Sequence, residues 1–323
     1  MQVGRTLCQP RGKCCVAKRR VARNAEQPAA SGGGTVKRQG TTGEGGAVLE
    51  NVDSRTVEDF GKEWARFSYG DGRLEDVRSV FDSYFEWIAD DLLSADRKGA
   101  DFGCGSGRWS ALVAPRVREL WCIDASAAAL AVARGNLAEL GNCHFAQEAI
   151  GELSIPDETF DFGYCLGVLH HVPDTERGLK DCVRTLKRGA PFLVYLYYAL
   201  DNRPGWYRRL WQVTNAVRWC IAAMPHPLKV ATCEVIAALV YWPLVQLSQL
   251  VERLGCNVAN WPLSFYRGKA YYILRNDALD RFGTRLEKRF TKRQILALME
   301  SSGLRDIRFS ERPPYWLAIG WKA

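Results

Sequence analysis

The stretch Asp101-Phe102-Gly103-Cys104-Gly105-Ser106-Gly107 decides the fold of this 323-residue chain. Three alternating glycines follow a short strand and open a predicted helix at Arg108–Val117. Glycine tolerates positive φ angles and lets a ligand approach the backbone closely, and a helix N-terminus presents free amide groups. The stretch therefore predicts a ligand-binding turn after a first strand, although a bare turn is an alternative.

Two well-known phosphate-binding motifs do not match this spacing. A dinucleotide fingerprint, GxGxxG, would need its third glycine at position 108 or 110, where the chain has Arg108 and Ser110. The phosphate loop GxxxxGK[ST] is absent, because no Gly-Lys pair is followed by Ser or Thr. The turn is therefore not expected to be built for phosphates.

An acidic residue ends the next predicted strand, Glu119–Asp124. Carboxyl ends of neighbouring parallel strands meet at one edge of a sheet, so Asp124 is expected beside the glycine turn. There its carboxylate can accept hydrogen bonds from both hydroxyls of a ribose. A plain helix N-cap before Ala127 is the alternative, and the two roles are compatible.

Apolar runs alternate with helical patterns along most of the chain, which indicates βαβ units and a doubly wound, mostly parallel Rossmann-like sheet. Two helices are expected within Val57–Leu93, and a final antiparallel strand pair at Asp306–Ser310 and Tyr315–Trp321. The further predicted strands are 99–103, 143–147, 160–168 and 191–198, and the further helices are 127–140, 174–186 and 291–302.

A helical insertion is expected between the fifth and sixth strands, and it contains five of the eleven tryptophans. The chain thus divides into a basic tail (1–55), N-terminal helices and core (56–200), the insertion (201–277) and the end of the core (278–323). Val235–Val251 runs without a charge but is short for a membrane span, which needs about 20 residues.

The net charge of +8 resides in the tail, because residues 1–40 hold nine Lys/Arg and one acid. The other 283 residues carry 35 basic and 35 acidic groups. A neutral body argues against nucleic acid as the main partner, since phosphate binding needs clustered cations. The first 50 residues read as a disordered tail, and organelle targeting by residues 1–40 is the alternative.

Eleven cysteines are scattered without a CxxC pair, and the four histidines do not complete a zinc site. No metal is expected. Reduced, buried thiols in a reducing compartment are the simplest interpretation, so a cytoplasmic protein is predicted, with membrane association as an alternative.

Taken together, Asp101–Gly107, Asp124, Phe160-Asp161 and Leu166–Val172 resemble the class I S-adenosylmethionine-dependent methyltransferases. The resemblance covers about Val57–Tyr198 and extends to the last helix and strand pair. It implies an enzyme that uses S-adenosyl-L-methionine as its cofactor, and it does not specify a substrate.

The resemblance also implies site residues. The glycine turn, through Gly103, Cys104, Gly105 and Gly107, would hold the methionine part of the cofactor, with Asp101 near its amino group. Asp124 would hold the ribose and Ala125 would lie against the adenine. Where the family often has an acid, this chain has Ala149, so Glu148 or the amides of Ala149 and Ile150 would contact the adenine. Leu166 and Gly167 would face the transferred methyl group.

Methyl transfer needs a general base where the acceptor must lose a proton, and His170 or His171 is the candidate. His170 is the prediction, and a structural role for the histidine pair is the alternative. Tyr195, Tyr197 and Tyr198 could line the acceptor pocket. Trp64 and Phe67 resemble a segment that some family members lay over the cofactor, with ordinary helix packing as the alternative.

Two amphipathic helices in the insertion leave three alternatives open: a lid over a lipophilic acceptor, peripheral membrane contact through 206–251, or packing on the sheet. The mixed charges from Arg275 to Arg289 read as a solvated helix face, and an arginine among them that binds an anionic group of the acceptor is the alternative. Methyl transfer to a small, apolar or lipid-like molecule is therefore predicted. A tRNA-modifying methyltransferase and a non-catalytic binding protein are the alternatives.

Overall fold

The computed structural model describes residues 51–69, 74–86 and 92–323. The targeting segment considered over 1–40 lies outside these residues, as does nearly all of the tail predicted over 1–55. The predictions for those segments are therefore not tested by the structure.

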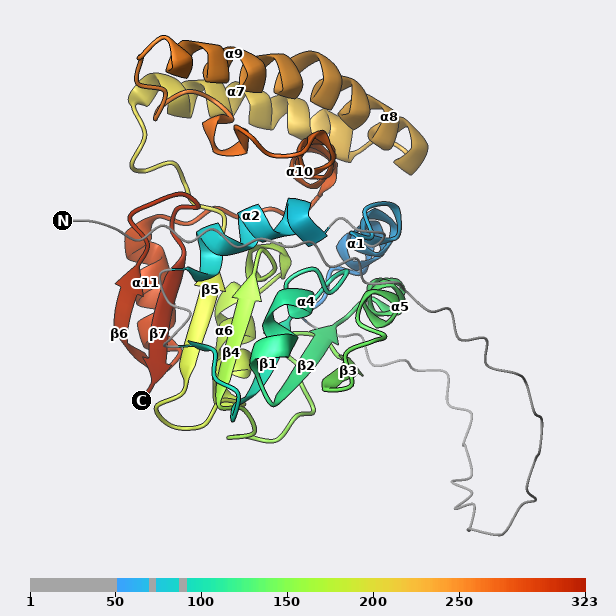
Figure 1. Cartoon of the computed structure of the whole chain (residues 1–323), viewed down its shortest axis with the longest axis vertical. Coiled ribbons are helices and arrows are strands. Elements are labelled where there is room, and N and C mark those ends of the chain that lie inside the picture. Colours follow the sequence, from blue (N-terminus) through green and yellow to red (C-terminus); the bar gives the residue numbers. More distant parts are fainter. Residues whose placement is uncertain (1–50, 70–73, 87–91) are drawn as a thin grey trace, which may run out of the picture. The chain divides into compact units, whose positions relative to one another are not determined.

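A seven-stranded sheet with the order β3-β2-β1-β4-β5-β7-β6 forms the centre of the fold (Figure 1). β7 pairs antiparallel with both β5 and β6, and the pairings among β1 to β5 are parallel. This confirms the predicted Rossmann-like sheet with a final antiparallel strand. The strands are β1 (Lys98–Phe102), β2 (Glu119–Asp124), β3 (Cys143–Gln147), β4 (Phe162–Leu166), β5 (Pro191–Tyr195), β6 (Leu304–Phe309) and β7 (Ala318–Lys322).

Helices pack on both faces of this sheet, which is why its central strands are buried along most of their length. Every residue of β4 is buried. Glycine at position 99 of β1 leaves room for the ring of Phe162 on β4, because a Cβ at this position would lie 2.0 Å from that ring. The helices outside the insertion are α1 (Ser54–Arg66), α2 (Leu74–Phe85), α4 (Ser110–Val113), α5 (Ala127–Asn136), α6 (Thr175–Arg184) and α11 (Lys292–Ser301).

Local sequence signals explain where these helices begin. Asp53 caps α1 by accepting the N–H of Thr56 at 2.7 Å, and Ser126 caps α5. Thr291 and Gln294 form a reciprocal capping box at the start of α11. The parallel strands then bring their carboxyl ends, and the loops that follow them, to one edge of the sheet.

Four α-helices lie between β5 and α11, beyond the carboxyl ends of the parallel strands (Figure 1). They are α7 (Gly205–Ala222), α8 (His226–Ile236), α9 (Trp242–Arg253) and α10 (Tyr271–Gly283). A π-helical turn, η3 (Ala237–Tyr241), joins α8 to α9, so the chain is helical from His226 to Arg253. The predicted segment boundary at 277 falls inside α10.

Arg218 of α7 is buried and donates to the carbonyl of Thr284 at 2.7 Å. One expectation about these helices needs correction. The charge-free run of Val235–Val251 was judged too short for a membrane span. The helix that contains it has 28 residues, so by length and composition it could cross a membrane, with 22% of its most apolar window buried in the protein.

Candidate active site

The glycine turn follows β1 in a conformation that favours glycine. Gly103, Gly105 and Gly107 have φ angles of +79°, +56° and +74°. A Cβ on Gly103 would lie 2.4 Å from Cγ2 of Val168, and one on Gly105 would lie 2.8 Å from the indole of Trp64. The turn is thus enclosed between the loop after β4 and helix α1.

Asp124, at the end of β2, holds this turn in place. Its Oδ2 accepts the backbone N–H of Gly105 at 2.9 Å, and its Oδ1 accepts that of Ser126 at 2.8 Å. Burial raises the pKa of Asp124, while these two backbone hydrogen bonds oppose the rise. Each carboxylate oxygen keeps further acceptor capacity, so two ribose hydroxyls could be bound from the adjoining cavity.

The loop after β3 forms the next wall. Glu148, Ala149 and Ile150 line the cavity, as does Ala125 after β2. Both carboxylate oxygens of Glu148 bond to Ser154, at 2.8 Å to its N–H and 2.6 Å to its hydroxyl. Asn51 was not predicted from the sequence. Its side chain donates to the carbonyls of Ile150 and Asp174 and accepts the N–H of Asp174.

The predicted cofactor residues are not all on the cavity surface. Those that line it are Gly103, Cys104, Asp124, Ala125, Glu148, Ala149, Ile150 and Leu166, whereas Asp101, Gly105 and Gly107 lie behind it. Asp101 is buried under the turn, where its Oδ2 accepts the hydroxyls of Ser110 at 2.6 Å and Tyr164 at 3.0 Å. Burial raises the pKa of Asp101 to about 7, against the effect of these two bonds. A role for Asp101 next to the cofactor remains a prediction.

The two histidines after β4 have different positions. His170 is fully buried, does not line the cavity and stacks on Tyr197 at a centroid distance of 3.9 Å. Burial lowers its pKa well below the usual range. His171 does line the cavity. Its Nδ1 lies 2.6 Å from the carbonyl oxygen of Leu286, so Nδ1 carries the proton and Nε2 keeps a lone pair.

The cavity has a volume of about 840 Å³ and runs from the glycine turn to the helices of the insertion. The three tyrosines Tyr195, Tyr197 and Tyr198 all line it, as does Trp64. Phe67, which was grouped with Trp64 as a cofactor cover, is instead buried in the core. Apolar lining from the insertion comes from Leu210, Trp211, Val217, Ile236, Val240, Tyr241, Leu244, Trp261, Leu263 and Phe265.

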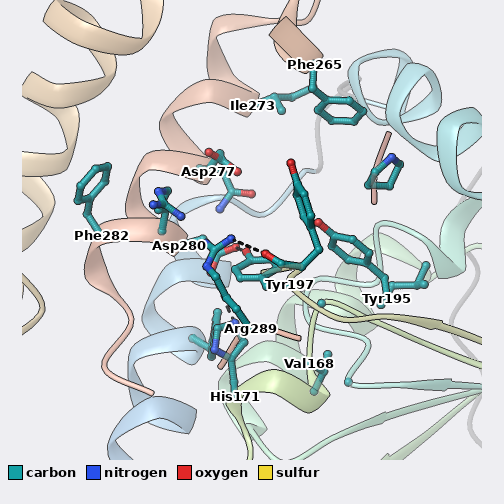
Figure 2. A pocket seen from close by; sticks show the side chains of 18 of the residues that line it. Val168, His171, Tyr195, Tyr197, Phe265, Ile273, Asp277, Asp280, Phe282 and Arg289 are labelled. Atoms are coloured by element: carbon teal, nitrogen blue, oxygen red, sulfur yellow. Dashed lines mark hydrogen bonds and ion pairs between the residues drawn. The ribbon is translucent and has the colours of Figure 1, made fainter. Parts of the chain in front are cut away.

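Polar side chains gather at one side of this cavity, where α10 meets the end of β5. Figure 2 shows Asp280, Tyr197 and Arg289 together, with His171 beside them and Asp277 further along α10. The hydroxyl of Tyr197 donates to Asp280, and that of Tyr266 donates to Asp277. Burial raises the pKa of each carboxyl to about 6. The prediction of a solvated face was therefore wrong for Asp277, Asp280 and Arg281, because all three line the cavity.

A family model described as a methyltransferase domain matches residues 100–194. A ubiquinone biosynthesis O-methyltransferase from Pseudomonas fluorescens is 31% identical over 159 residues, which cover 48% of this chain and 66% of that relative. An uncharacterized methyltransferase from Bacillus subtilis is 31% identical over 110 residues, or 33% of this chain and 44% of the relative.

The chain carries a class I S-adenosylmethionine-dependent methyltransferase domain. A solved structure of a putative methyltransferase from Bacillus halodurans has a TM-score of 0.41 and 16% identity, over 70% of this chain and 71% of that one. Because the matched stretch falls short of the full length of the curated relatives, the acceptor and activity of the whole chain are proposals.

S-adenosyl-L-methionine is the cofactor of this methyltransferase domain, and the residues present fit it. Asp124 offers a carboxylate with spare acceptor capacity at the cavity wall, and glycine at position 103, where φ is +79°, avoids a Cβ that would lie 2.4 Å from Val168. Ala149 and Ile150 line the cavity with apolar side chains, against which a base could lie. The roles given to individual residues stay predictions.

Proposed function

We propose that this chain transfers the methyl group of S-adenosylmethionine to a small, largely apolar acceptor that binds between the sheet edge and the insertion. One observation carries the proposal: a continuous cavity joins Asp124 to Tyr241, Leu244 and Phe265. A donor at the glycine turn and an acceptor under α7, α9 and α10 would thus share one enclosed space, which is the arrangement that direct group transfer requires.

The bound cofactor supplies an activated methyl group on a positively charged sulfur. The chain's own contribution is then to position the acceptor and to exclude water. Leu166 and Tyr195, at the ends of β4 and β5, line the cavity between the glycine turn and α10. Tyr84 of α2 packs edge-on against Tyr195, with ring centroids 5.3 Å apart, and so limits where an acceptor ring can lie.

His171 and Asp280 supply a polar contact for the acceptor. Nε2 of His171 and Oδ1 of Asp280 lie 3.8 Å apart, and neither has a hydrogen-bond partner among the residues that the structure describes. Both atoms are hydrogen-bond acceptors when His171 is neutral, and burial lowers its pKa to about 4. An acceptor hydroxyl or amine would satisfy this pair, and either group could take its proton.

The predicted base, His170, has no contact with the cavity, so the proposal gives the proton-accepting role to His171 and Asp280. A hydroxyl acceptor agrees with the name of the Pseudomonas fluorescens relative, a ubiquinone biosynthesis O-methyltransferase. The proposal extends this class of acceptor, a lipophilic hydroxyl compound, to the present chain.

The test is methyl transfer from radiolabelled S-adenosylmethionine to four acceptors: a prenylated phenol, the same phenol without its chain, a prenylated amine and bulk tRNA. We expect transfer to the prenylated phenol with a higher kcat/KM than to the short phenol. Preferential methylation of tRNA would support the tRNA-modifying alternative instead. Binding of S-adenosylhomocysteine without transfer to any of the four would contradict the proposal and favour a non-catalytic role.

A further inference from the structure

The insertion carries an unusual surface. In the described part of the chain, every large hydrophobic side chain that is strongly exposed lies between residues 206 and 254. Those on α7 are Trp206, Leu210, Val213, Val217 and Trp219, and those from α8 onward are Leu228, Val235, Leu239, Val240, Trp242, Leu247, Leu250 and Leu254. We call these thirteen side chains the apolar face. A soluble protein without a binding partner for this segment would not concentrate exposed apolar side chains on it.

The long helix from His226 to Arg253 has two different sides. Its buried residues recur every three or four positions and face the protein: Lys229, Cys233, Ala237, Tyr241, Val245 and Ser248. Lys229 pairs with Asp59 of α1 at 2.8 Å, and Glu234 pairs with Arg66 at 2.8 Å and Arg275 at 2.6 Å. These ion pairs fasten one side of the helix to α1 and α10, and they leave the apolar face on the other side.

This arrangement favours a helix that lies along a bilayer over one that crosses it. To cross, the helix would have to leave α1 and α10 and carry Lys229 and Glu234 into hydrocarbon, at a cost of about 3 kcal/mol for each charge at the bilayer centre. A helix that lies along the surface keeps the ion pairs of Lys229 and Glu234 and buries only apolar side chains in the bilayer.

The charge and aromatic pattern of the apolar face matches a lipid headgroup layer. Three exposed tryptophans, Trp206, Trp219 and Trp242, belong to the side-chain type that concentrates at membrane interfaces. Arg208 and Arg209 are exposed on α7 next to them. From residue 206 to 254 the chain has two acids, Glu234 and Glu252, and each is paired with an arginine. The face therefore has no carboxylate without a cationic partner, which limits its repulsion from an anionic lipid surface.

The cavity opens onto this same face. Leu210, Val217 and Val240 are strongly exposed and also line the cavity, and Leu244 lines it beside them. These residues come from α7 on one side and from η3 and α9 on the other. A lipophilic molecule could pass between these helices from a bilayer to Tyr241 and Tyr197 without crossing water.

We propose that the apolar face docks on the surface of an anionic lipid bilayer, and that the acceptor enters the cavity between α7 and the η3–α9 segment. This inference rests on the proposed function for the entry of the acceptor, but the docking itself does not require methyl transfer. A second copy of this chain is the competing occupant of the face, and it is an outcome of the test.

The test measures flotation of the full chain with vesicles, without cofactor or acceptor. Vesicles of phosphatidylcholine alone are compared with vesicles that also contain phosphatidylglycerol. The variant Val213→Ser/Trp219→Ser/Leu239→Ser removes exposed apolar side chains that do not line the cavity. We expect the parent to bind the anionic vesicles and this variant to bind at least about tenfold more weakly, because each loss removes buried apolar area.

Two double variants, each of which removes two positive charges, distinguish contact with lipid headgroups from apolar contact with the bilayer. Arg208→Gln/Arg209→Gln should weaken binding to anionic vesicles only, whereas Arg188→Gln/Arg118→Gln, at exposed positions of the sheet domain, should leave it unchanged. Thermal stabilisation by S-adenosylhomocysteine should be the same in all variants, which shows that each one folds.

Failure of the parent to bind either vesicle, or equal binding by the triple variant, would overturn the inference. A parent that sediments as a dimer without binding vesicles, and a triple variant that sediments as a monomer, would also overturn it. Bound protein that resists extraction with alkaline carbonate would overturn it too, because such resistance indicates a spanning helix. Because no step here measures methyl transfer, a chain that docks but methylates no acceptor would refute the proposed function and leave the docking intact.

Discussion

The carboxylate of Asp124 accepts the backbone N–H of Gly105 at 2.9 Å, and this bond joins the tips of the first two strands. The second carboxylate oxygen accepts the N–H of Ser126, the residue that caps α5, so Asp124 also positions the start of that helix. One side chain thus fixes the glycine turn, the next helix and the wall of the cavity.

The shape of the glycine turn can be tested with two alanine variants. Gly103→Ala and Gly189→Ala both place a Cβ at a φ above +70°, a strain of about 1–2 kcal/mol. At Gly103 the Cβ also meets Val168 at 2.4 Å, whereas nothing lies within 4 Å at Gly189. We expect both variants to lower the melting temperature, and Gly103→Ala alone to lose affinity for S-adenosylhomocysteine by calorimetry. Equal affinity in the two variants would refute a role for the turn in binding.

Asp101 should make the free energy of unfolding depend on pH. Burial raises its folded pKa to about 7, far above the value near 3.9 expected in an unfolded chain. The folded state therefore favours the protonated acid, and this contribution to stability is lost as the pH rises from about 4 to about 7. Asp101→Asn should become more stable relative to the parent across that range, as measured by urea unfolding.

Asp161→Asn is the matched control for this experiment. Lys187 and the N–H of Lys98 outweigh partial burial and lower the pKa of Asp161, so its contribution is already complete above pH 5. The stability difference between Asp161→Asn and the parent should stay constant from pH 5 to 7. A constant difference for Asp101→Asn as well would show that Asp101 does not titrate in this range.

Asp280 should determine the pH dependence of methyl transfer. Its pKa is raised to about 6, chiefly by burial, and Tyr197, Glu287, Arg108 and Arg289 act on it as well. If the ionised carboxylate receives the acceptor's proton with His171, kcat/KM should rise from pH 5 to 7 and stay flat above. Asp280→Asn should remove this rise and lower the plateau by about 10²-fold or more. A profile that keeps its rise near pH 6 in Asp280→Asn would assign the titration to another group.

Much of the sheet could be predicted because its signals are local. The strand bounds at Glu119–Asp124 and Cys143–Gln147 agree with the structure residue for residue, since apolar runs end at polar turns there. The helix predicted over 291–302 also agrees with the structure, where the side chain of Thr291 caps its first turn. In each case the information lies within about ten residues, which a single sequence contains.

The acceptor side of the site could not be predicted in this way. Asp277 and Asp280 lie on a helix with mixed charges, and such a pattern normally faces water. Here it faces a cavity, because α7 and α9 cover it from segments more than twenty residues away. Asn51 bonds to Ile150 across 99 positions and has no local signature.

The central claim is that Asp124 binds the ribose of S-adenosylmethionine, and calorimetry with S-adenosylhomocysteine tests it most directly. Asp124→Asn is compared with the parent and with Asp157→Asn, whose side chain is 71% exposed. Replacing charged hydrogen bonds, each worth about 1.5–3 kcal/mol, should weaken binding by about 10- to 100-fold in Asp124→Asn and leave Asp157→Asn unchanged. Equal heats and affinities for Asp124→Asn and the parent, or no binding by the parent, would contradict the claim.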